Sequence, residues 1–189
     1  FPYPTGDKIW STPVVQDGVV YFASLDHKLY AIYADTGELK WDEPFETGGA
    51  ITSASLVVEG VVYVGSFGGK FYAIYADTGE QKWVFEEANG WFWSKAVYDN
   101  GTIYVGCLDH NVYAIDADTG KLKWDKPFET SGRVISSPVI AGGVLLVVSE
   151  DGEVYGLDLE TGDERWQHFD LEAKVIAPLC AAGSKVYIN

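Results

Sequence analysis

Few side chains in this sequence have the type and spacing that a catalytic or metal-binding site needs. His27 and His110 stand at equivalent positions of the repeat described below, each directly after an Asp. Imidazole nitrogens bind transition metals, so one hypothesis is a paired metal site that uses both rings. The interpretation we favour is that each is a turn residue, because His adopts left-handed backbone more readily than β-branched residues do. Gly69 and Gly152 take the same place in two other repeats.

The cysteines and one Asp-rich turn are weaker candidates. Cys107 and Cys180 form no CxxC pair, so they lack the spacing of a redox or zinc motif. We expect both to be buried and to form no disulfide, because they belong to different strand types, whose Cα atoms would exceed the limit of about 7 Å. The run Asp116-Ala-Asp118-Thr-Gly120 has the start of a calcium loop, but no Glu follows at the twelfth place. It is therefore expected to be an ordinary turn.

Charge excludes two classes of partner. The 189 residues include 13 Lys and Arg against 28 Asp and Glu, a formal net charge of −15. Nucleic-acid binding needs a basic surface, and anionic lipid attracts basic segments, so neither partner is expected. No apolar run approaches the roughly 18 residues of a membrane span. The sequence lacks Met and begins Phe-Pro-Tyr-Pro, which we interpret as a piece of a longer protein or a processed chain.

An internal repeat must position these side chains. Four segments align without gaps, from Tyr-Ala-Ile-Tyr-Ala-Asp-Thr-Gly-Glu-Leu-Lys-Trp in the first to Tyr-Gly-Leu-Asp-Leu-Glu-Thr-Gly-Asp-Glu-Arg-Trp in the fourth. Their terminal tryptophans follow one another at intervals of 42, 41 and 42 residues. A second pattern, small residues followed by an apolar run, recurs between them. The sequence therefore divides into four full repeats and a partial fifth, at about residues 9–49, 50–90, 91–132, 133–173 and 174–189.

Each repeat is predicted to form four short β-strands joined by tight turns. Pairs such as Asp17-Gly18 favour a hairpin between the first two strands, and the apolar second strand is typical of burial on both faces. The repeated Asp-Thr-Gly should turn the chain with its glycine in left-handed geometry, and the fourth strand carries the Trp. The residues with these repeated roles are Gly37, Gly79, Gly120, Gly162, Trp41, Trp83, Trp124 and Trp166.

The pattern predicts an all-β fold, a β-propeller. A four-stranded meander of about 42 residues is typical of a propeller blade. Both faces of such a blade are apolar, so it needs a neighbour on each side, and the repeated Trp can bury a large apolar area against that neighbour. We expect one propeller domain over residues 1–189, with four blades and part of a fifth.

The run Tyr-Ala-Ile-x-Ala-Asp-Thr-Gly-x-x-x-Trp resembles the repeat of the pyrroloquinoline-quinone (PQQ)-type β-propellers, in four consecutive repeats. This resemblance implies a ring of about seven or eight blades. We therefore expect an open arc, part of a larger ring, rather than a closed four-bladed ring. Its end blades would expose apolar faces, and either a second copy, in a homo-oligomer, or the missing half of a parent propeller would cover them.

The resemblance leaves three functions open. The family includes quinoprotein dehydrogenases, sensor domains attached to kinases, and non-enzymatic scaffolds such as the propeller lipoprotein of the bacterial outer-membrane β-barrel assembly machinery. A dehydrogenase of this family would hold PQQ between a Trp and a disulfide of adjacent cysteines, beside Ca²⁺ bound by Glu, Asn and Asp. This sequence has no adjacent cysteines and no recognisable set of such ligands. We therefore expect no catalytic residue, no cofactor and no metal site.

Aromatic residues cluster at the start of the third repeat. Trp91, Phe92 and Trp93 directly precede its first strand, and Trp10 stands at the position equivalent to Trp93. Trp is enriched at binding hot spots, so these four residues form the candidate recognition surface, near one rim of the ring. The alternative is that they pack between blades.

These observations favour a non-catalytic scaffold that binds a protein or peptide, through a ring face or by strand addition at a blade edge. One alternative is a fragment of a PQQ-dependent quinoprotein dehydrogenase, with PQQ and Ca²⁺. The other is the ligand-sensing domain of a receptor. The resemblance implies a location outside the cytoplasm: periplasmic, secreted or at the cell surface.

Overall fold

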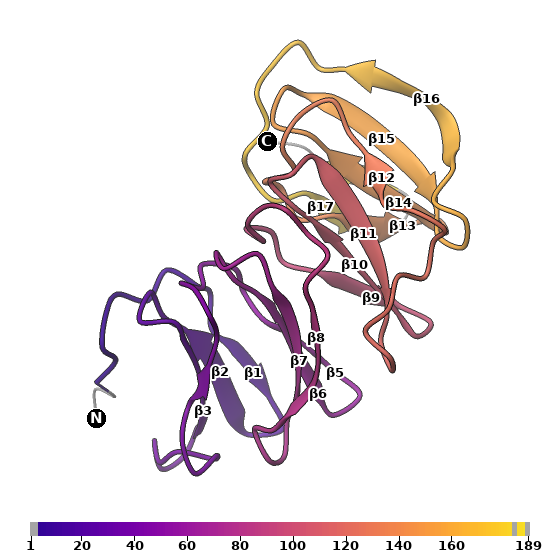
Figure 1. The fold of residues 1–189 in the computed structure, drawn as a ribbon. Coiled ribbons are helices and arrows are strands. Elements are labelled where there is room, and N and C mark those ends of the chain that lie inside the picture. Colours follow the sequence, from indigo (N-terminus) through magenta and orange to yellow (C-terminus); the bar gives the residue numbers. More distant parts are fainter. Residues whose placement is uncertain (1–3, 183–184, 188–189) are drawn as a thin grey trace. The chain divides into compact units, whose positions relative to one another are not determined.

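The structure is a computed structural model that describes residues 4–182 and 185–187. These residues form antiparallel β-sheets joined by short turns, as the repeat pattern predicts (Figure 1). None of them belongs to a helix that is long and apolar enough to cross a membrane. The chain divides into two compact units, residues 1–92 and 93–189, called the first and the second unit below. The single domain and the open arc stay predictions.

Each unit contains two four-stranded antiparallel sheets whose strands follow chain order, which is the topology of a propeller blade. In the first unit, blade one consists of β1 (Val14–Gln16), β2 (Val19–Ala23), β3 (Lys28–Tyr33) and β4 (Phe45–Glu46), and blade two of β5 (Leu56–Val58), β6 (Val61–Gly65), β7 (Phe71–Tyr75) and β8 (Gln81–Phe85). In the second unit, blade three consists of β9 (Val97–Asp99), β10 (Thr102–Gly106), β11 (Asn111–Asp116) and β12 (Phe128–Glu129), and blade four of β13 (Val139–Ala141), β14 (Val144–Val148), β15 (Glu153–Asp158) and β16 (Glu164–Asp170). The hairpin β17 (Cys180–Ala182) and β18 (Lys185–Tyr187) completes the second unit. The fold is thus a partial β-propeller.

The hairpin between the first two strands is set by two left-handed residues. Asp17 and Gly18 have φ values of 50° and 76°, the combination of a type I′ turn, whose twist matches that of the flanking strands. The turn fixes the register, with Val15 opposite Val20. The same positive φ values recur at Glu59-Gly60, Asn100-Gly101 and Gly142-Gly143.

The fourth strand differs between odd and even blades. In blades two and four it is continuous, and β8 and β16 contain the repeat tryptophan. In blades one and three the pairing with the third strand is interrupted. Leu39 and Leu122 form isolated bridges to that strand, β4 and β12 pair with it again, and Trp41 and Trp124 lie between the two stretches. The prediction that the fourth strand carries the Trp is therefore wrong for these two blades. Pro44 and Pro127 explain the difference, because proline lacks the N–H that a ladder needs and restricts the residue before it.

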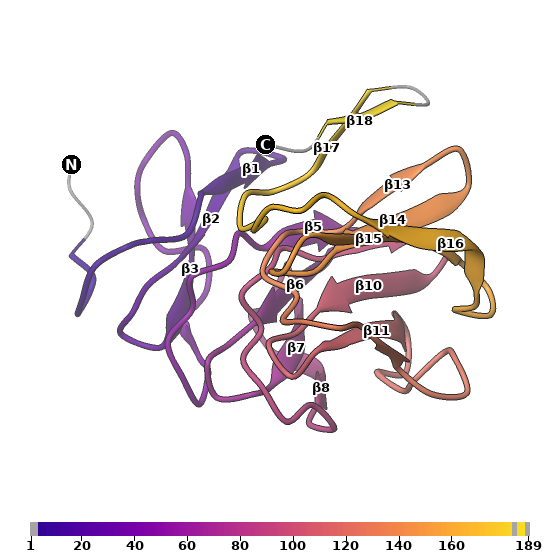
Figure 2. The same ribbon diagram turned by 90° about the horizontal axis from the view of Figure 1, so that it is seen from above.

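Apolar faces of neighbouring blades form the core of each unit. In the first unit, Leu29 and Ala31 of β3 share one buried cluster with Val62 and Ile74 of blade two, and the ribbons of these blades lie side by side in both views (Figures 1 and 2). All four side chains are fully buried. Burial of a Val, Leu or Ile side chain contributes about 1.5–3 kcal/mol, so neither blade is expected to be stable alone.

The repeat tryptophan joins neighbouring blades. Trp41 is 3% exposed, and its indole Nε1 donates a hydrogen bond of 3.0 Å to the carbonyl oxygen of Ala76 in blade two. Its ring covers Gly79, where an added Cβ would stand 2.7 Å from ring atoms. Trp124 donates in the same way from blade three to blade four, at 3.0 Å, and its ring covers Gly162. The left-handed glycine thus both makes its turn and leaves room for the indole.

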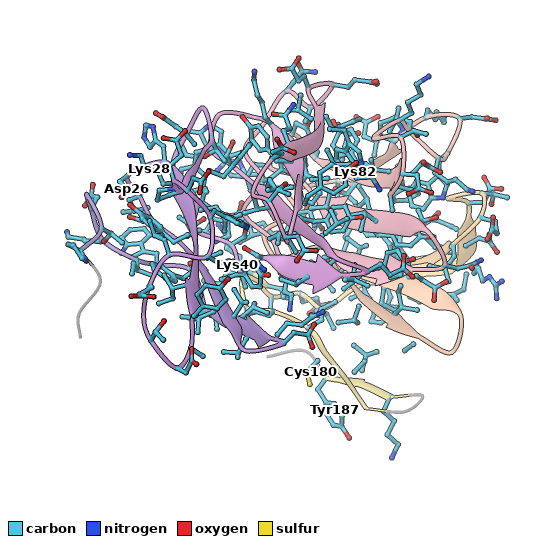
Figure 3. The ribbon with its side chains drawn as sticks, turned by 90° about the horizontal axis from the view of Figure 1, so that it is seen from below. Asp26, Lys28, Lys40, Lys82, Cys180 and Tyr187 are labelled. Carbon is cyan, nitrogen blue, oxygen red and sulfur yellow. The ribbon has the colours of Figure 1, made fainter. Side chains whose placement is uncertain are left out.

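The two cysteines lie in different surroundings. Neither forms a disulfide, which confirms the prediction. Cys107 follows β10 and is buried, whereas Cys180 is exposed, so the expectation that both are buried is wrong for Cys180. The physical reason is that Cys180 stands on the two-stranded hairpin β17–β18, opposite Tyr187 (Figure 3). Strand side chains point to the two faces of their sheet, and on this hairpin Ala181, Lys185 and Tyr187 are exposed as well.

The turn that resembles a calcium loop is closed by its own carboxylate. Asp116 accepts hydrogen bonds from Thr119 Oγ1 at 2.7 Å, Thr119 N at 2.8 Å and Asp118 N at 3.2 Å. The Thr119 hydroxyl, followed by the backbone N–H groups, holds the pKa of Asp116 below its usual range. The carboxylate therefore acts as the cap of an ordinary turn.

Replacing this cap should make stability depend on pH. The variant Asp116→Ala is expected to lose about 0.5–1.5 kcal/mol of unfolding free energy at neutral pH, the worth of a typical net hydrogen bond. Because the folded pKa lies below the unfolded value of about 3.9, this stabilisation is present above the unfolded pKa and is lost as the pH falls through the folded pKa. Urea unfolding at a series of pH values should show the two proteins converging in acid. A difference that is the same at every pH would contradict the role of the charge.

Candidate recognition surface

A buried serine fixes the start of the first strand in several blades. Ser11 Oγ donates a hydrogen bond of 2.8 Å to the carbonyl oxygen of Ala23 and accepts one of 2.9 Å from Ala23 N. Ser94 and Ser136 donate in the same way to the second strands of their blades, at 3.1 and 2.9 Å. The residues before Ser11 and Ser94 are exposed, whereas Ile135, before Ser136, is only partly exposed.

Two of the candidate aromatics occupy this exposed position. Trp10 precedes Ser11 and is 61% exposed, and Trp93 precedes Ser94 and is 37% exposed. Ile176, at the equivalent place in the partial fifth repeat, is 64% exposed. Trp10 and Trp93, each next to a hydrogen-bonded serine, are thus exposed rather than buried.

Phe92 differs from its two neighbours. We predicted it on the same surface, but its side chain is fully buried. Its ring centroid lies 5.3 Å from that of Phe71, and its Cβ covers Gly65, where an added methyl group would overlap it. The correction follows from the alternation along the chain: Trp91 and Trp93 point out, so the residue between them points in. Phe92 supports the surface and is not part of it.

The structure adds one residue that the sequence analysis missed. Phe67, in the turn between β6 and β7, stacks on Trp91 with ring centroids 4.6 Å apart and an interplanar angle of 13°. Trp91 keeps 49% of its surface exposed. Beside the pair lies a cavity of about 280 Å³, lined by Phe67, Gly68, Gly69, Ala88, Asn89, Gly90 and Trp91. The signal in the sequence was an aromatic residue where two of the other three repeats have Leu25 and Leu108.

The second unit has a charged counterpart of this aromatic pair. Glu150 and Lys174 occupy the positions that correspond to Phe67 and Trp91, 83 residues further along the sequence. Lys174 Nζ lies 3.6 Å from Glu150 Oε1. They border a cavity of about 250 Å³, whose other lining residues are His110, Gly132, Arg133 and Asp151. The equivalent places therefore differ in charge: the first unit has an uncharged aromatic stack, and the second has an ion pair.

The histidines are turn residues in their blades. His27 and His110 have φ values of 72° and 71°, which are left-handed, as the interpretation we favoured requires. The carbonyl oxygen of His27 accepts hydrogen bonds from Thr47 N and Thr47 Oγ1, at 2.8 and 2.9 Å. Among residues 4–182 and 185–187 no group of three or more His, Cys, Asp or Glu side chains is placed to hold a metal ion.

Carboxylates near these turns have structural partners. Asp26, which follows β2, accepts hydrogen bonds from Tyr30 Oη at 2.6 Å and from Gly6 N at 2.7 Å. Burial works to raise the pKa of Asp26, but these hydrogen bonds prevail and hold the pKa below its usual range. A carboxylate that stays ionised and fully bonded is suited to hold a turn rather than to transfer protons.

Comparison with a known family gives a match over nearly the whole chain. The profile of the family described as outer membrane protein assembly factor BamB matches twice, over residues 4–92 and 89–188. No curated protein sequence gives a significant match.

Solved structures with the same fold include a family member, a designed protein and an enzyme. BamB from Moraxella catarrhalis superposes with a TM-score of 0.81 at 22% identity, covering 97% of this chain and 56% of that one. The computationally designed Ika8 protein gives 0.81 at 16% identity, covering 93% and 54%. The quinohemoprotein alcohol dehydrogenase ADHIIG from Pseudomonas putida HK5 gives 0.72 at 19% identity, covering 92% and 36%. The chain thus spans little more than half the length of the first two proteins, and at these identities the likeness shows the fold alone.

Proposed function

The chain belongs to the family of PQQ-type β-propellers described as outer membrane protein assembly factor BamB, and we propose that it is a non-catalytic module that binds a protein or peptide partner. The observation that carries this proposal is the exposure of indole rings in both units, those of Trp10 and Trp91 in the first and that of Trp93 in the second. Large aromatic side chains are costly to leave in water and are enriched at binding hot spots. Trp10 and Trp93 directly precede serines that are hydrogen-bonded to the second strand of their blades, which reduces the entropy lost on binding.

The described residues fit a scaffold better than a quinoprotein dehydrogenase. By resemblance, that enzyme holds PQQ against a disulfide of adjacent cysteines. In this chain Cys107 directly follows β10 and is buried, and Cys180 is exposed on the hairpin β17–β18. The carboxylates of Asp26 and Asp116 accept hydrogen bonds from side chains near their own turns. This donor set does not fit PQQ with Ca²⁺, and we propose no reaction through that cofactor.

The family description also supports a location and a kind of partner. Its members are described as assembly factors for outer membrane proteins, so we propose that this chain works outside the cytoplasm and binds another protein there. The net charge of −15 is consistent with a protein partner and unfavourable for nucleic acid.

Peptide selection tests this function directly. Peptides chosen from a random library for binding to the chain are expected to bind at least about tenfold more weakly to a variant with Trp10→Ala, Trp91→Ala and Trp93→Ala, since loss of a hot-spot aromatic costs 2 kcal/mol or more. Tyr75→Ala is the matched control, because Tyr75 is 44% exposed but stands at the end of β7, outside the proposed surface.

Two results would overturn the proposal. The first is a set of selected peptides that bind the triple variant as well as the parent chain. The second is a saturable absorbance change on titration with PQQ and Ca²⁺, together with dye reduction by an alcohol, which would make the chain a dehydrogenase module instead.

A further inference from the structure

The cavity beside Trp91 has features that select the charge of its ligand. Its volume is about 280 Å³, and none of its seven lining residues carries a charge. One wall is the Phe67–Trp91 stack, of which Trp91 remains 49% exposed. A cavity of this size holds one side chain of a partner rather than a whole small molecule. An exposed indole attracts cations through its quadrupole more strongly than other aromatic rings do.

Glycines keep this cavity open and bring carbonyl oxygens close to it. Gly69 has a φ of 76°, so any other residue would be strained there. A Cβ on Gly69 would lie 3.4 Å from the carbonyl oxygen of Gly90 and 3.7 Å from that of Ala88. Two hydrogen-bond acceptors therefore border the space that the missing side chain leaves, beside the aromatic wall.

The surrounding charge favours a cation. Lys70, next to Gly69, forms an ion pair with Glu86, and that carboxylate raises the pKa of the Lys70 ammonium. The positive charge nearest along the chain is thus already compensated. Residues 1–92 contain five Lys, no Arg and thirteen Asp or Glu, so the field of the first unit attracts positive groups.

We propose that this cavity binds the side chain of an arginine, or more weakly a lysine, presented by the partner. The guanidinium lies against the Trp91 ring and donates hydrogen bonds to the carbonyl oxygens of Ala88 and Gly90. Arginine is favoured because its planar head stacks on aromatic faces and offers several donors in a fixed geometry. This inference rests on the proposed function, because it names the chemistry by which that surface recognises a peptide.

The second unit contains a built-in comparison. At the equivalent place it carries Lys174 and Glu150 in an ion pair, with Arg133 lining the same cavity. Two cationic side chains, Arg133 and Lys174, line that cavity, and its lining has no counterpart of the Phe67–Trp91 stack. It is therefore expected not to bind arginine, and its residues define the substitutions that should switch the first site off.

A blocked tripeptide, acetyl-Gly-Arg-Gly amide, is the probe that tests the proposal. In ¹⁵N-labelled chain, the seven tryptophans give separate indole N–H signals, and Trp91 is assigned by its loss in Trp91→Phe. We expect a saturable shift of the Trp91 signal at millimolar peptide, weakened by salt. The citrulline peptide, which has nearly the same shape without charge, should bind at least about tenfold more weakly. The probe N,N′-diacetylchitobiose, a neutral sugar that also stacks on aromatic rings, should cause no shift.

Variants separate this site from the rest of the surface. Trp91→Lys, which installs the residue of the second unit, should abolish the response, and Tyr75→Ala, outside the proposed surface, should leave it unchanged. If Trp91→Lys does not fold, as judged from its own amide spectrum, Trp91→Ala replaces it. Equal shifts with arginine and citrulline, a response to the sugar, or an arginine response that survives loss of Trp91 would each overturn the proposal.

The outcomes also distinguish the inference from the function on which it rests. If selected peptides depend on Trp10, Trp91 and Trp93 but the arginine probe does not bind, the charge preference is wrong and the scaffold function stands. If the arginine probe binds at Trp91 but peptide selection yields no binder that depends on these residues, the scaffold function is wrong and the cavity binds free cations.

Discussion

Alanine at Gly79 is expected to lower the free energy of unfolding by about 1–3 kcal/mol more than alanine at Gly37, the usual cost of overfilling a packed site. The two glycines stand at the same place in the turns of blades two and one, with φ values of 78° and 73°. Each N–H donates to the carbonyl oxygen four residues earlier, at 2.9 and 2.8 Å. The cost of a left-handed alanine, about 1–2 kcal/mol, is therefore common to both.

The difference between the two sites is the tryptophan. A Cβ at Gly79 would meet ring and Cβ atoms of Trp41 at 2.7–3.1 Å, whereas a Cβ at Gly37 would meet nothing within 4 Å. Trp41 cannot move aside freely, because its Nε1 is bonded to the carbonyl oxygen of Ala76. The alanine at Gly79 is therefore expected to disturb both the packing of the Trp41 ring and its hydrogen bond to Ala76.

Urea unfolding of Gly79→Ala and Gly37→Ala, with the parent chain beside them, measures the difference. The indole signal of Trp41 should move in Gly79→Ala and stay in place in Gly37→Ala. Gly162→Ala provides an independent repetition in the second unit, since a Cβ there would lie 2.6 Å from the Trp124 ring. Equal losses of stability at Gly37 and Gly79 would show that the ring contact contributes nothing beyond the turn.

The sequence predicts those parts of the fold that local chemistry determines. Asp17-Gly18 and the glycine of each Asp-Thr-Gly have few alternatives to positive φ, so their turns could be placed from residue type alone. The repeat interval then assigns equivalent positions without any tertiary information. The identity of the blade followed from four copies of one pattern, because a strand that is apolar on both faces requires neighbours on both sides.

What the sequence did not predict depends on nonlocal contacts or on single departures from the repeat. The short β4 and β12 follow from Pro44 and Pro127, which are departures from the repeat in blades one and three. The burial of Phe92 depends on Gly65 lying opposite it, 27 residues away. Phe67 gained its role only through stacking on Trp91. The candidate surface was therefore found from its tryptophans, but its cavity could be seen only in three dimensions.

The two thiols are expected to differ at least about a thousandfold in their reaction with Ellman's reagent in the native protein, because exposing a core group requires an opening that costs several kcal/mol. Cys180 is exposed on the hairpin β17–β18 and should react at once. Cys107 is fully buried, and burial also raises the pKa of its thiol well above the ordinary value. The thiolate is the reactive form. Cys107 is therefore protected both because the reagent cannot reach it and because its thiol stays protonated.

Two variants turn this difference into a probe of the second unit. Cys180→Ser should remove the fast phase and leave one thiol that reacts only as fast as the protein opens. Adding Gly162→Ala should then accelerate Cys107, because the contact between Gly162 and Trp124 holds together blades three and four of the unit that contains this thiol. Adding Gly37→Ala instead should leave the rate unchanged if the two units open independently. Rapid modification of Cys107 in the Cys180→Ser chain would contradict its place in the core, and two slow thiols in the parent chain would contradict the exposure of the hairpin.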